Sequence, residues 1–478
     1  MIIGIISSCS NSANKIPITT SSSRAKQNYL IGRELMEKLR NSDSRKYFAK
    51  AVADDPDFAM AHLLMAYGQG SQKAFMNSFN KALGLIDNVS PGEKIFILAA
   101  DAGIKGDSPK QQELYQELTE IYPGDERAHQ ALANFFFGQH DYEKALEKYY
   151  TIIEIAPEFS AAYNQMGYCF RALEKYDSAE VAFDKYIQLI PNEPNPYDSY
   201  AELLLKRGKY QKSIEMYREA LKIDLEFSPS HIGIATNYNL MGEHKKAREQ
   251  LESLLEVLDE PLIARIASGA RAVSYADEGF LDSALAELEK RYEIELDRNE
   301  ILSAAEFRQL IARIHIEKGN FDKAGESYDF GSKIVEQSDL PDELKENSRT
   351  YGLYFTALIY TLNDDLKSAE PLAEQFREKA EIKGNQQQIR VSHLLNGIIF
   401  MKKDQFDKAI SEFSQLDLGD SNSLFRLANA YEASGDLSKA LENYKKAANT
   451  NSLNSLNYAL TRHKAKAKAE ELSKKLSS

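Results

Sequence analysis

The sequence predicts an all-α fold, in which roughly twelve antiparallel helix pairs stack into a superhelical solenoid. Three observations support this prediction. The prolines Pro123, Pro157 and Pro191 recur at intervals of 34 residues, small and aromatic residues keep one register between them, and a turn that begins with glycine recurs along the chain. Hydrophobic residues make up 43% of the 478 residues and charged residues 27%, so the chain has enough apolar surface to fold.

The most regular repeat covers residues 160–193. Its packing positions are Tyr163, Met166, Gly167, Phe170, Ala179, Phe183 and Pro191. The small residues Gly167 and Ala179 allow two helices to approach closely, and the aromatic side chains fill the gaps beside them. Pro191 ends the second helix, because proline lacks the backbone N–H and clashes with the preceding turn. This pattern resembles the tetratricopeptide repeat (TPR), and the resemblance implies one helical hairpin per repeat.

A glycine turn marks further repeats downstream. Gly208, Gly319 and Gly435 each begin a short segment that leads into a second helix. Glycine there supplies the C-cap of the first helix, and the apolar residue that follows docks into the hairpin. The turn therefore extends the repeat prediction beyond the stretch in which the prolines recur.

The repeats predict four segments. They are a signal-like segment and flexible leader over 1–24, an N-terminal TPR array over 25–260 that is most regular over 126–251, a less regular C-terminal TPR array over 261–452, and a capping helix with a basic tail over 453–478. Uneven spacing beyond Ala247 predicts longer helices or loops. Residues 90–123 match the repeat least well. The basic residues of the tail, Arg462 and Lys464 among them, are expected either to face solvent or to dock on an acidic partner.

Composition narrows the class of partner. The formal net charge of -13 argues against a surface that binds nucleic acid or an anionic membrane, so we expect a protein or peptide partner. The two cysteines, Cys9 and Cys169, allow neither a disulfide framework nor a zinc site built on cysteine. Cys169 falls within a predicted helix, where a small buried thiol is expected.

The N-terminus resembles the end of a bacterial lipoprotein signal. Ile6, Ser7 and Ser8 precede Cys9, as an aliphatic and two small residues precede the lipidated cysteine of such signals. The resemblance implies lipidation of Cys9 and an exported protein, periplasmic or anchored in the outer membrane by this lipid alone. No Lys or Arg precedes the apolar run, and the run is short, so a cytoplasmic location is the alternative.

The first helix of each TPR hairpin generally lines a concave groove, and projection of these helices gives candidate partner-binding residues. They are Arg127, Gln130, Asn134, Asn164, Tyr168, Arg171, Asn195, Asp198, Glu202, Tyr351 and Tyr354. An asparagine amide suits this task because it both donates to and accepts from an extended peptide backbone. The carboxylate clamp of chaperone-binding TPR domains, a set of Lys, Asn and Arg on three successive hairpins, does not occur in these helices.

Motifs of catalysis and metal binding are missing from the sequence. There is no H-E-x-x-H, no G-x-S-x-G elbow and no G-x-x-x-x-G-K-S/T phosphate loop, and no stretch is left to house a catalytic domain. We therefore expect no enzyme activity, no catalytic residue, no cofactor and no metal.

Three functional interpretations follow. Nearly the whole chain resembles exported bacterial TPR proteins of unassigned function, which favours a non-catalytic scaffold that binds a protein or peptide in its groove in the bacterial cell envelope. A glycan-binding lipoprotein of the SusD class is an alternative, but the sequence contains no Trp to stack on sugars. A cytoplasmic TPR regulator that senses a peptide is the other alternative.

Overall fold

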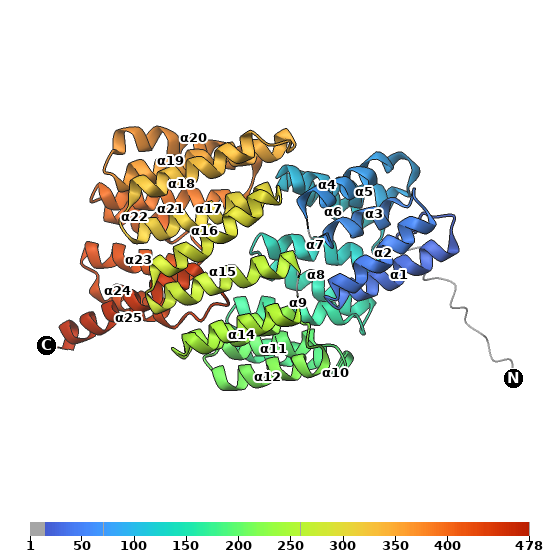
Figure 1. Ribbon diagram of the computed structural model, residues 1–478, viewed down its shortest axis with the longest axis horizontal. Helices are drawn as coiled ribbons and strands as arrows, with labels where there is room; N and C mark the ends of the chain where they lie inside the picture. The colour runs from blue at the N-terminus through green and yellow to red at the C-terminus, as the bar shows by residue number, and fades with distance from the viewer. Residues whose placement is uncertain (1–14, 70, 259, 478) are drawn as a thin grey trace. The chain divides into compact units, whose positions relative to one another are not determined.

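The computed structural model describes residues 15–69, 71–258 and 260–477, and the regular structure in these residues is entirely helical. The chain forms two compact units, residues 1–196 (unit 1) and 197–478 (unit 2). Within each unit, consecutive helices pair as antiparallel hairpins (Figure 1), and successive hairpins pack side by side. The predicted all-α fold of stacked helix pairs is confirmed.

Unit 1 contains five hairpins and one short 3-10 helix in its described part. The helices are α1 (Ser23–Glu37), α2 (Asn41–Asp54), α3 (Ala59–Tyr67), α4 (Gln72–Gly84), η1 (Ile86–Asn88), α5 (Pro91–Lys105), α6 (Ser108–Ile121), α7 (Glu126–Gly138), α8 (Tyr142–Ile155), α9 (Ser160–Ala172) and α10 (Tyr176–Leu189).

Unit 2 contains seven hairpins and a final helix in its described part. The helices are α11 (Asn195–Lys206), which begins in the last two residues of unit 1, α12 (Tyr210–Ile223), α13 (Ser228–Leu240), α14 (His244–Val257), α15 (Pro261–Glu278), α16 (Leu281–Asp297), α17 (Ile301–Glu317), α18 (Phe321–Glu336), α19 (Asp342–Leu362), α20 (Leu366–Lys383), α21 (Gln386–Lys402), α22 (Phe406–Phe413), α23 (Ser421–Ser434), α24 (Leu437–Asn449) and α25 (Leu456–Ser477). The described helices α1 to α24 thus form twelve pairs, as the repeat spacing predicts.

Left-handed residues make the turns within the hairpins. Gly208 has φ 71°, and the N–H of Lys209 donates to the Leu204 carbonyl at 2.8 Å, so the end of α11 is closed by the backbone. His140 and Glu174 occupy the same place after α7 and α9, with φ 63° and 57°. The turn therefore recurs also where glycine is missing, which the sequence pattern does not reveal.

Close approach of the paired helices explains the small residue of the repeat. A Cβ atom on Gly167 would lie 2.5 Å from the Phe183 ring, which is fully buried on the partner helix. Gly397 faces Phe413 in the same way, at 2.3 Å. The pairing of a small residue with an aromatic ring is thus a packing constraint that recurs in different hairpins.

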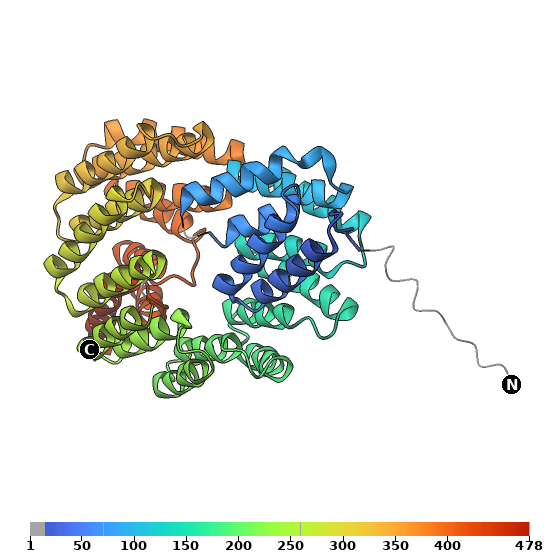
Figure 2. The same cartoon turned by 45° about the vertical axis from the view of Figure 1, so that its right-hand side comes forward.

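The less regular second half has longer helices. Helices α9 to α14 contain 12 to 14 residues, whereas α15 to α21 contain 16 to 21. Figure 2 shows these longer helices in unit 2, where α19 and α20 form an extended hairpin. The repeats beyond Ala247 are therefore longer because their own helices are longer, as expected from the uneven spacing.

Residues 90–123, the weakest match to the repeat, also form a hairpin. Ser90 and Glu93 make a capping box at the start of α5, in which each side chain accepts the backbone N–H of the other. Gly106, with φ 74°, ends α5. Local capping chemistry therefore defines this hairpin where the repeat residues are poorly matched.

The C-terminal helix α25 packs on α23 and α24, and also on α15 much earlier in the chain. Ala465, Ala469 and Leu472 bury its apolar face. Arg462, at the start of this basic stretch, is largely covered and contacts the buried Asp277 carboxylate at 2.5 Å. Lys464 is exposed and contacts Glu317 at 2.7 Å. The curvature of unit 2 brings acidic residues of α15 and α17 to these positions.

Candidate functional site

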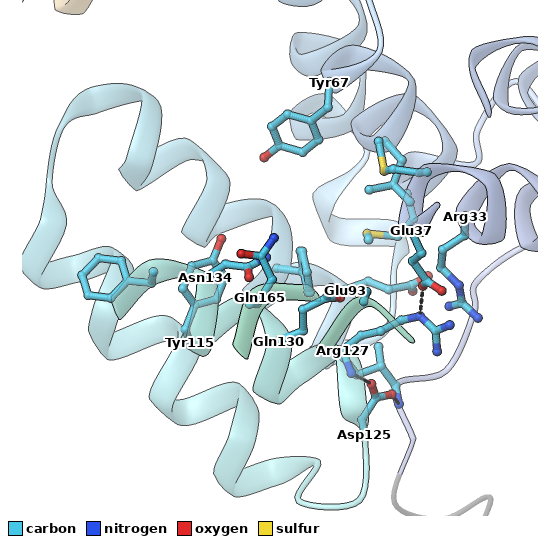
Figure 3. A pocket seen from close by; sticks show the side chains of 18 of the residues that line it. Arg33, Glu37, Tyr67, Glu93, Tyr115, Asp125, Arg127, Gln130, Asn134 and Gln165 are labelled. Carbon is cyan, nitrogen blue, oxygen red and sulfur yellow. Dashed lines mark hydrogen bonds and ion pairs between the residues drawn. The ribbon is translucent and has the colours of Figure 1, made fainter. Parts of the chain in front are cut away.

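A cavity of about 600 Å³ opens on the inner face of unit 1. The first helices of all five hairpins, α1, α3, α5, α7 and α9, contribute to its wall, together with α6 and residues 16–18 of the leader. Figure 3 shows side chains from these separate helices converging on one space. This agrees with the expectation that the first helix of each hairpin lines the inner face.

Apolar side chains form one part of the wall. Met36, Met60, Leu64, Phe96 and Phe135 line the cavity from four different helices. Tyr67, which is 52% exposed, also lines the cavity (Figure 3). Such a surface releases ordered water when it contacts an apolar ligand group, which makes burial there favourable.

Amide side chains form the second part of the wall. Gln130, Asn134, Asn164 and Gln165 all line the cavity from α7 and α9. The Tyr149 hydroxyl donates to Asn134 Oδ1 at 2.6 Å, which orients the amide and leaves its N–H groups to donate elsewhere. Asn164 is only 5% exposed, and its Oδ1 has no hydrogen-bond partner among the residues that the structure describes. A buried acceptor without a donor is costly, so a ligand N–H at this position would be stabilised.

The two arginines of the cavity wall differ in whether they have a carboxylate partner. Arg127 Nε donates to Glu37 Oε1 at 2.8 Å (Figure 3), and Arg127 also pairs with Glu126. Burial opposes the charge of Arg127, but these carboxylates raise its pKa above the ordinary value. Arg33 has no carboxylate partner among the described residues and lies 5.6 Å from the Tyr29 ring centroid. Arg33 is therefore the cationic group of the wall that is left for a ligand.

Residues 16–18 of the leader line this cavity, and polar contacts join the leader to the inner helices. The Ile16 N–H donates to Asp125 at 2.8 Å and the Thr19 N–H to Glu93 at 2.9 Å. Lys15 pairs with Glu126. The carboxylates that accept these bonds also cap α5 and α7, so the leader runs across the starts of two inner helices. Cys9, the predicted lipidation site, lies outside the described residues.

The other candidate residues on α9 and α11 do not line the cavity. The Arg171 guanidinium stacks 4.6 Å from the Tyr168 ring centroid. Asn195 is buried and donates to the Tyr186 hydroxyl at 2.7 Å. Asp198, 3% exposed, accepts from the Ser230 hydroxyl at 2.7 Å. Burial, and then the charge of Glu202, raise the pKa of Asp198 well above its ordinary value.

The two tyrosines predicted on α19 belong to unit 2. Tyr351 lines a second cavity of about 310 Å³ between α17, α18 and α19. There Phe355 stacks on Tyr328 at a centroid distance of 4.0 Å. Tyr354 contacts Phe355 and Phe376, with centroid distances of 5.2 and 5.7 Å. Both tyrosines thus have aromatic neighbours, and neither shares a site with the residues of α7 and α9.

The helical projection of the sequence did not identify Arg33 and Tyr67 as residues that line the cavity. Each follows the small packing residue of its first helix, Gly32 or Ala66. Asn134 follows Ala133 in the same register. Extension of that rule to the first two hairpins would have found both residues.

Neither a membrane-spanning helix nor a metal-binding group occurs in the part of the chain that the structure describes. No helix there is both long and apolar enough to cross a membrane. No group of three or more His, Cys, Asp or Glu side chains within residues 15–69, 71–258 and 260–477 could hold a metal ion.

Comparison with known proteins identifies the repeat directly. The tetratricopeptide-repeat family model matches residues 160–193, 195–227 and 421–452. Anaphase-promoting complex subunit 3 of Schizosaccharomyces pombe is 25% identical over 247 residues, which are 50% of this chain and 36% of the relative. The chain thus matches only about a third of that relative's length.

Solved structures resemble the chain more loosely. The APC/C hetero-tetramer Cut9-Hcn1 aligns over 94% of this chain and 76% of its own, with 12% identity and a TM-score of 0.41. A tetratricopeptide repeat protein from Parabacteroides merdae aligns over 54% of this chain and 98% of its own, with 14% identity and a TM-score of 0.39. Neither superposition is close, so the identification of the repeat depends on the three matched segments.

Proposed function

We propose, from the premise that this chain is a tetratricopeptide-repeat protein with a fold typical of protein–protein interaction, that it is a non-catalytic scaffold. Its binding surface is the cavity of unit 1, and its ligand is an extended peptide segment of a protein partner. The observation that carries this proposal is the combination of an apolar wall with amide side chains from two successive inner helices.

An extended peptide fits the chemistry of this wall. Its backbone presents alternating N–H and C=O groups, and the Asn164 carbonyl and Asn134 N–H groups offer the complementary acceptor and donors. Apolar side chains of the peptide would contact Met60, Leu64 and Phe96. Arg33 would favour a peptide with an acidic residue beside its apolar ones.

Selection of peptides from a random display library on the full chain tests the proposal. We expect enriched sequences that combine apolar and acidic residues, and binding of a labelled representative measured by fluorescence anisotropy. Asn164→Ala and Gln130→Ala should each weaken this binding about tenfold, the usual consequence of losing a buried hydrogen bond to a ligand.

A matched control is Asn443→Ala, which removes an exposed amide of α24 that bonds to the Lys439 carbonyl of its own helix. The control should bind the peptide as the native chain does. If no peptide is enriched, or if both cavity variants bind with native affinity, the cavity is not the binding surface.

The proposed location is the bacterial cell envelope, through a lipid on Cys9. The support is the sequence Ile6-Ser7-Ser8-Cys9 and its similarity to a lipoprotein signal. Labelled palmitate should enter the native chain in bacterial cells but not a Cys9→Ala variant. Equal labelling of the two chains would exclude this anchor.

A further inference from the structure

Three inner helices of unit 2 bring two arginines and a tyrosine together. Arg313 of α17 donates from Nη2 to Asn422 Oδ1 of α23 at 3.3 Å, although 109 residues separate them. Arg426 lies one helical turn after Asn422 on α23, and Tyr354 of α19 packs against the apolar core that contains Leu427 and Ala430 of the same helix. Burial raises the pKa of the Tyr354 hydroxyl, and the charges of Arg426 and Arg313 oppose that rise. The curvature of unit 2 therefore assembles a cluster that no single repeat contains.

This cluster contains no ion pair. Among the described residues, no carboxylate lies within ion-pair distance of Arg313 or Arg426, and the Nε donors of both are buried without an acceptor. The acidic groups nearby are engaged elsewhere. Glu317 binds Lys464 of α25 at 2.7 and 2.9 Å, and Asp420 accepts the Ser423 N–H at the start of α23.

Two other arginines of the same unit have carboxylate partners. Arg291 pairs with Glu295, and Arg462 contacts Asp277 at 2.5 Å. Burial, with the charge of Arg313 as a second cause, lowers the pKa of Arg426 to about 10, so the side chain still carries its charge at neutral pH. Two like charges with buried Nε donors and no counterion are unfavourable. In a chain of net charge -13, in which Arg291 and Arg462 have carboxylate partners, this cluster lacks an anion.

We propose that Arg313, Arg426 and Tyr354 form an oxyanion-binding site on the inner face of unit 2, which takes a carboxylate or phosphate group of a ligand. Guanidinium groups present paired N–H donors that match the oxygens of either group. The Tyr354 hydroxyl and the Asn422 amide N–H groups, whose carbonyl already accepts from Arg313, add neutral donors.

The charge of the cluster selects among anions. Two guanidinium charges are matched by a dianion, such as a phosphate group or two adjacent carboxylates, better than by a single carboxylate. The two arginines come from the first helices of hairpins that are not adjacent in sequence, α17–α18 and α23–α24. The site is thus independent of the peptide-binding cavity proposed in unit 1.

Isothermal titration of the full chain tests this site with two probes. The probes are inorganic phosphate and a diglutamate blocked at both ends, compared at constant ionic strength. We expect saturable binding of at least one probe, and the probe that binds identifies the source of the oxyanion. Arg426→Gln and Arg313→Gln should each weaken it at least about tenfold, because each removes charge-assisted hydrogen bonds.

The control variant is Arg377→Gln, which removes an arginine of α20 whose side chain is 42% exposed and pairs with Glu374 at 2.6 Å. It has the same net charge as the other two variants and should bind the probe with native affinity. Melting curves check that each variant is folded, and Arg313→Gln serves if Arg426→Gln does not fold. Failure of the native chain to bind either probe saturably, or native affinity in the folded cluster variants, would overturn the proposal.

Discussion

Replacement of Gly167 by alanine should destabilise the hairpin α9–α10. The new Cβ would lie 2.5, 2.6 and 2.8 Å from three atoms of the Phe183 ring, whereas ordinary contact begins near 3.4 Å. The ring must therefore move by about 0.9 Å, and it is fully buried. Such overpacking costs about 1–3 kcal/mol. Alanine regains about 1 kcal/mol of helix propensity over glycine, so we expect a net loss of up to about 2 kcal/mol.

Hydrogen exchange is the appropriate assay, because an array of repeats can lose stability locally without unfolding as a whole. Amides of α9 and α10 should exchange up to about thirtyfold faster in Gly167→Ala, the factor that corresponds to a loss of about 2 kcal/mol. The matched control is Gly352→Ala in α19, where a Cβ meets no atom within 4 Å. This control should slow exchange in its own helix, because it gains propensity without a clash.

A double variant separates the clash from other effects. Phe183→Leu removes the ring, so Gly167→Ala should cost less in that background than in the native chain. If Gly167→Ala protects its hairpin as the control does, the small residue of the repeat is not required by packing. The explanation of the repeat pattern by close helix approach would then be wrong.

Three further predictions concern buried charges and the leader. Asp198→Asn should raise the melting temperature at pH 7 by roughly 2 °C or more, because burial raises the pKa of this carboxyl. The variant should also flatten the decline in stability as pH rises above about 4. Differential scanning calorimetry measures this, and an unchanged or lower melting temperature contradicts it. Glu93→Ala should release the leader at a cost of about 3 kcal/mol, since Thr19 and Ser90 lose their acceptor, and limited proteolysis within residues 15–22 would detect it. Although burial opposes its charge, the Lys15 bond and the Arg127 charge lower the pKa of Glu126. The contribution of Glu126 to stability is therefore present above pH 4.5 and lost as the pH falls below it. If hydrogen exchange of the leader amides is equally sensitive to acid in Glu126→Gln, this reasoning is refuted.

The sequence predicted only some of the residues that line the cavity. Arg127, Gln130, Asn134 and Asn164 share one cavity, as the helical projection of the repeat suggests. Asn195 has the same kind of projected position but is buried against Tyr186. Projection along one helix cannot separate the two outcomes, because it does not report which neighbouring helix covers a given face.

The sequence by itself determined the hairpins, their number and the small-to-aromatic packing between paired helices, because these contacts join residues close in the chain and recur with its period. Only the tertiary structure decided which charges are paired. Lys15 meets Glu126, Arg462 meets Asp277, and Arg313 meets Asn422, in each case across more than a hundred residues. These contacts depend on the curvature of each array, which follows from the lengths and packing angles of many helices together.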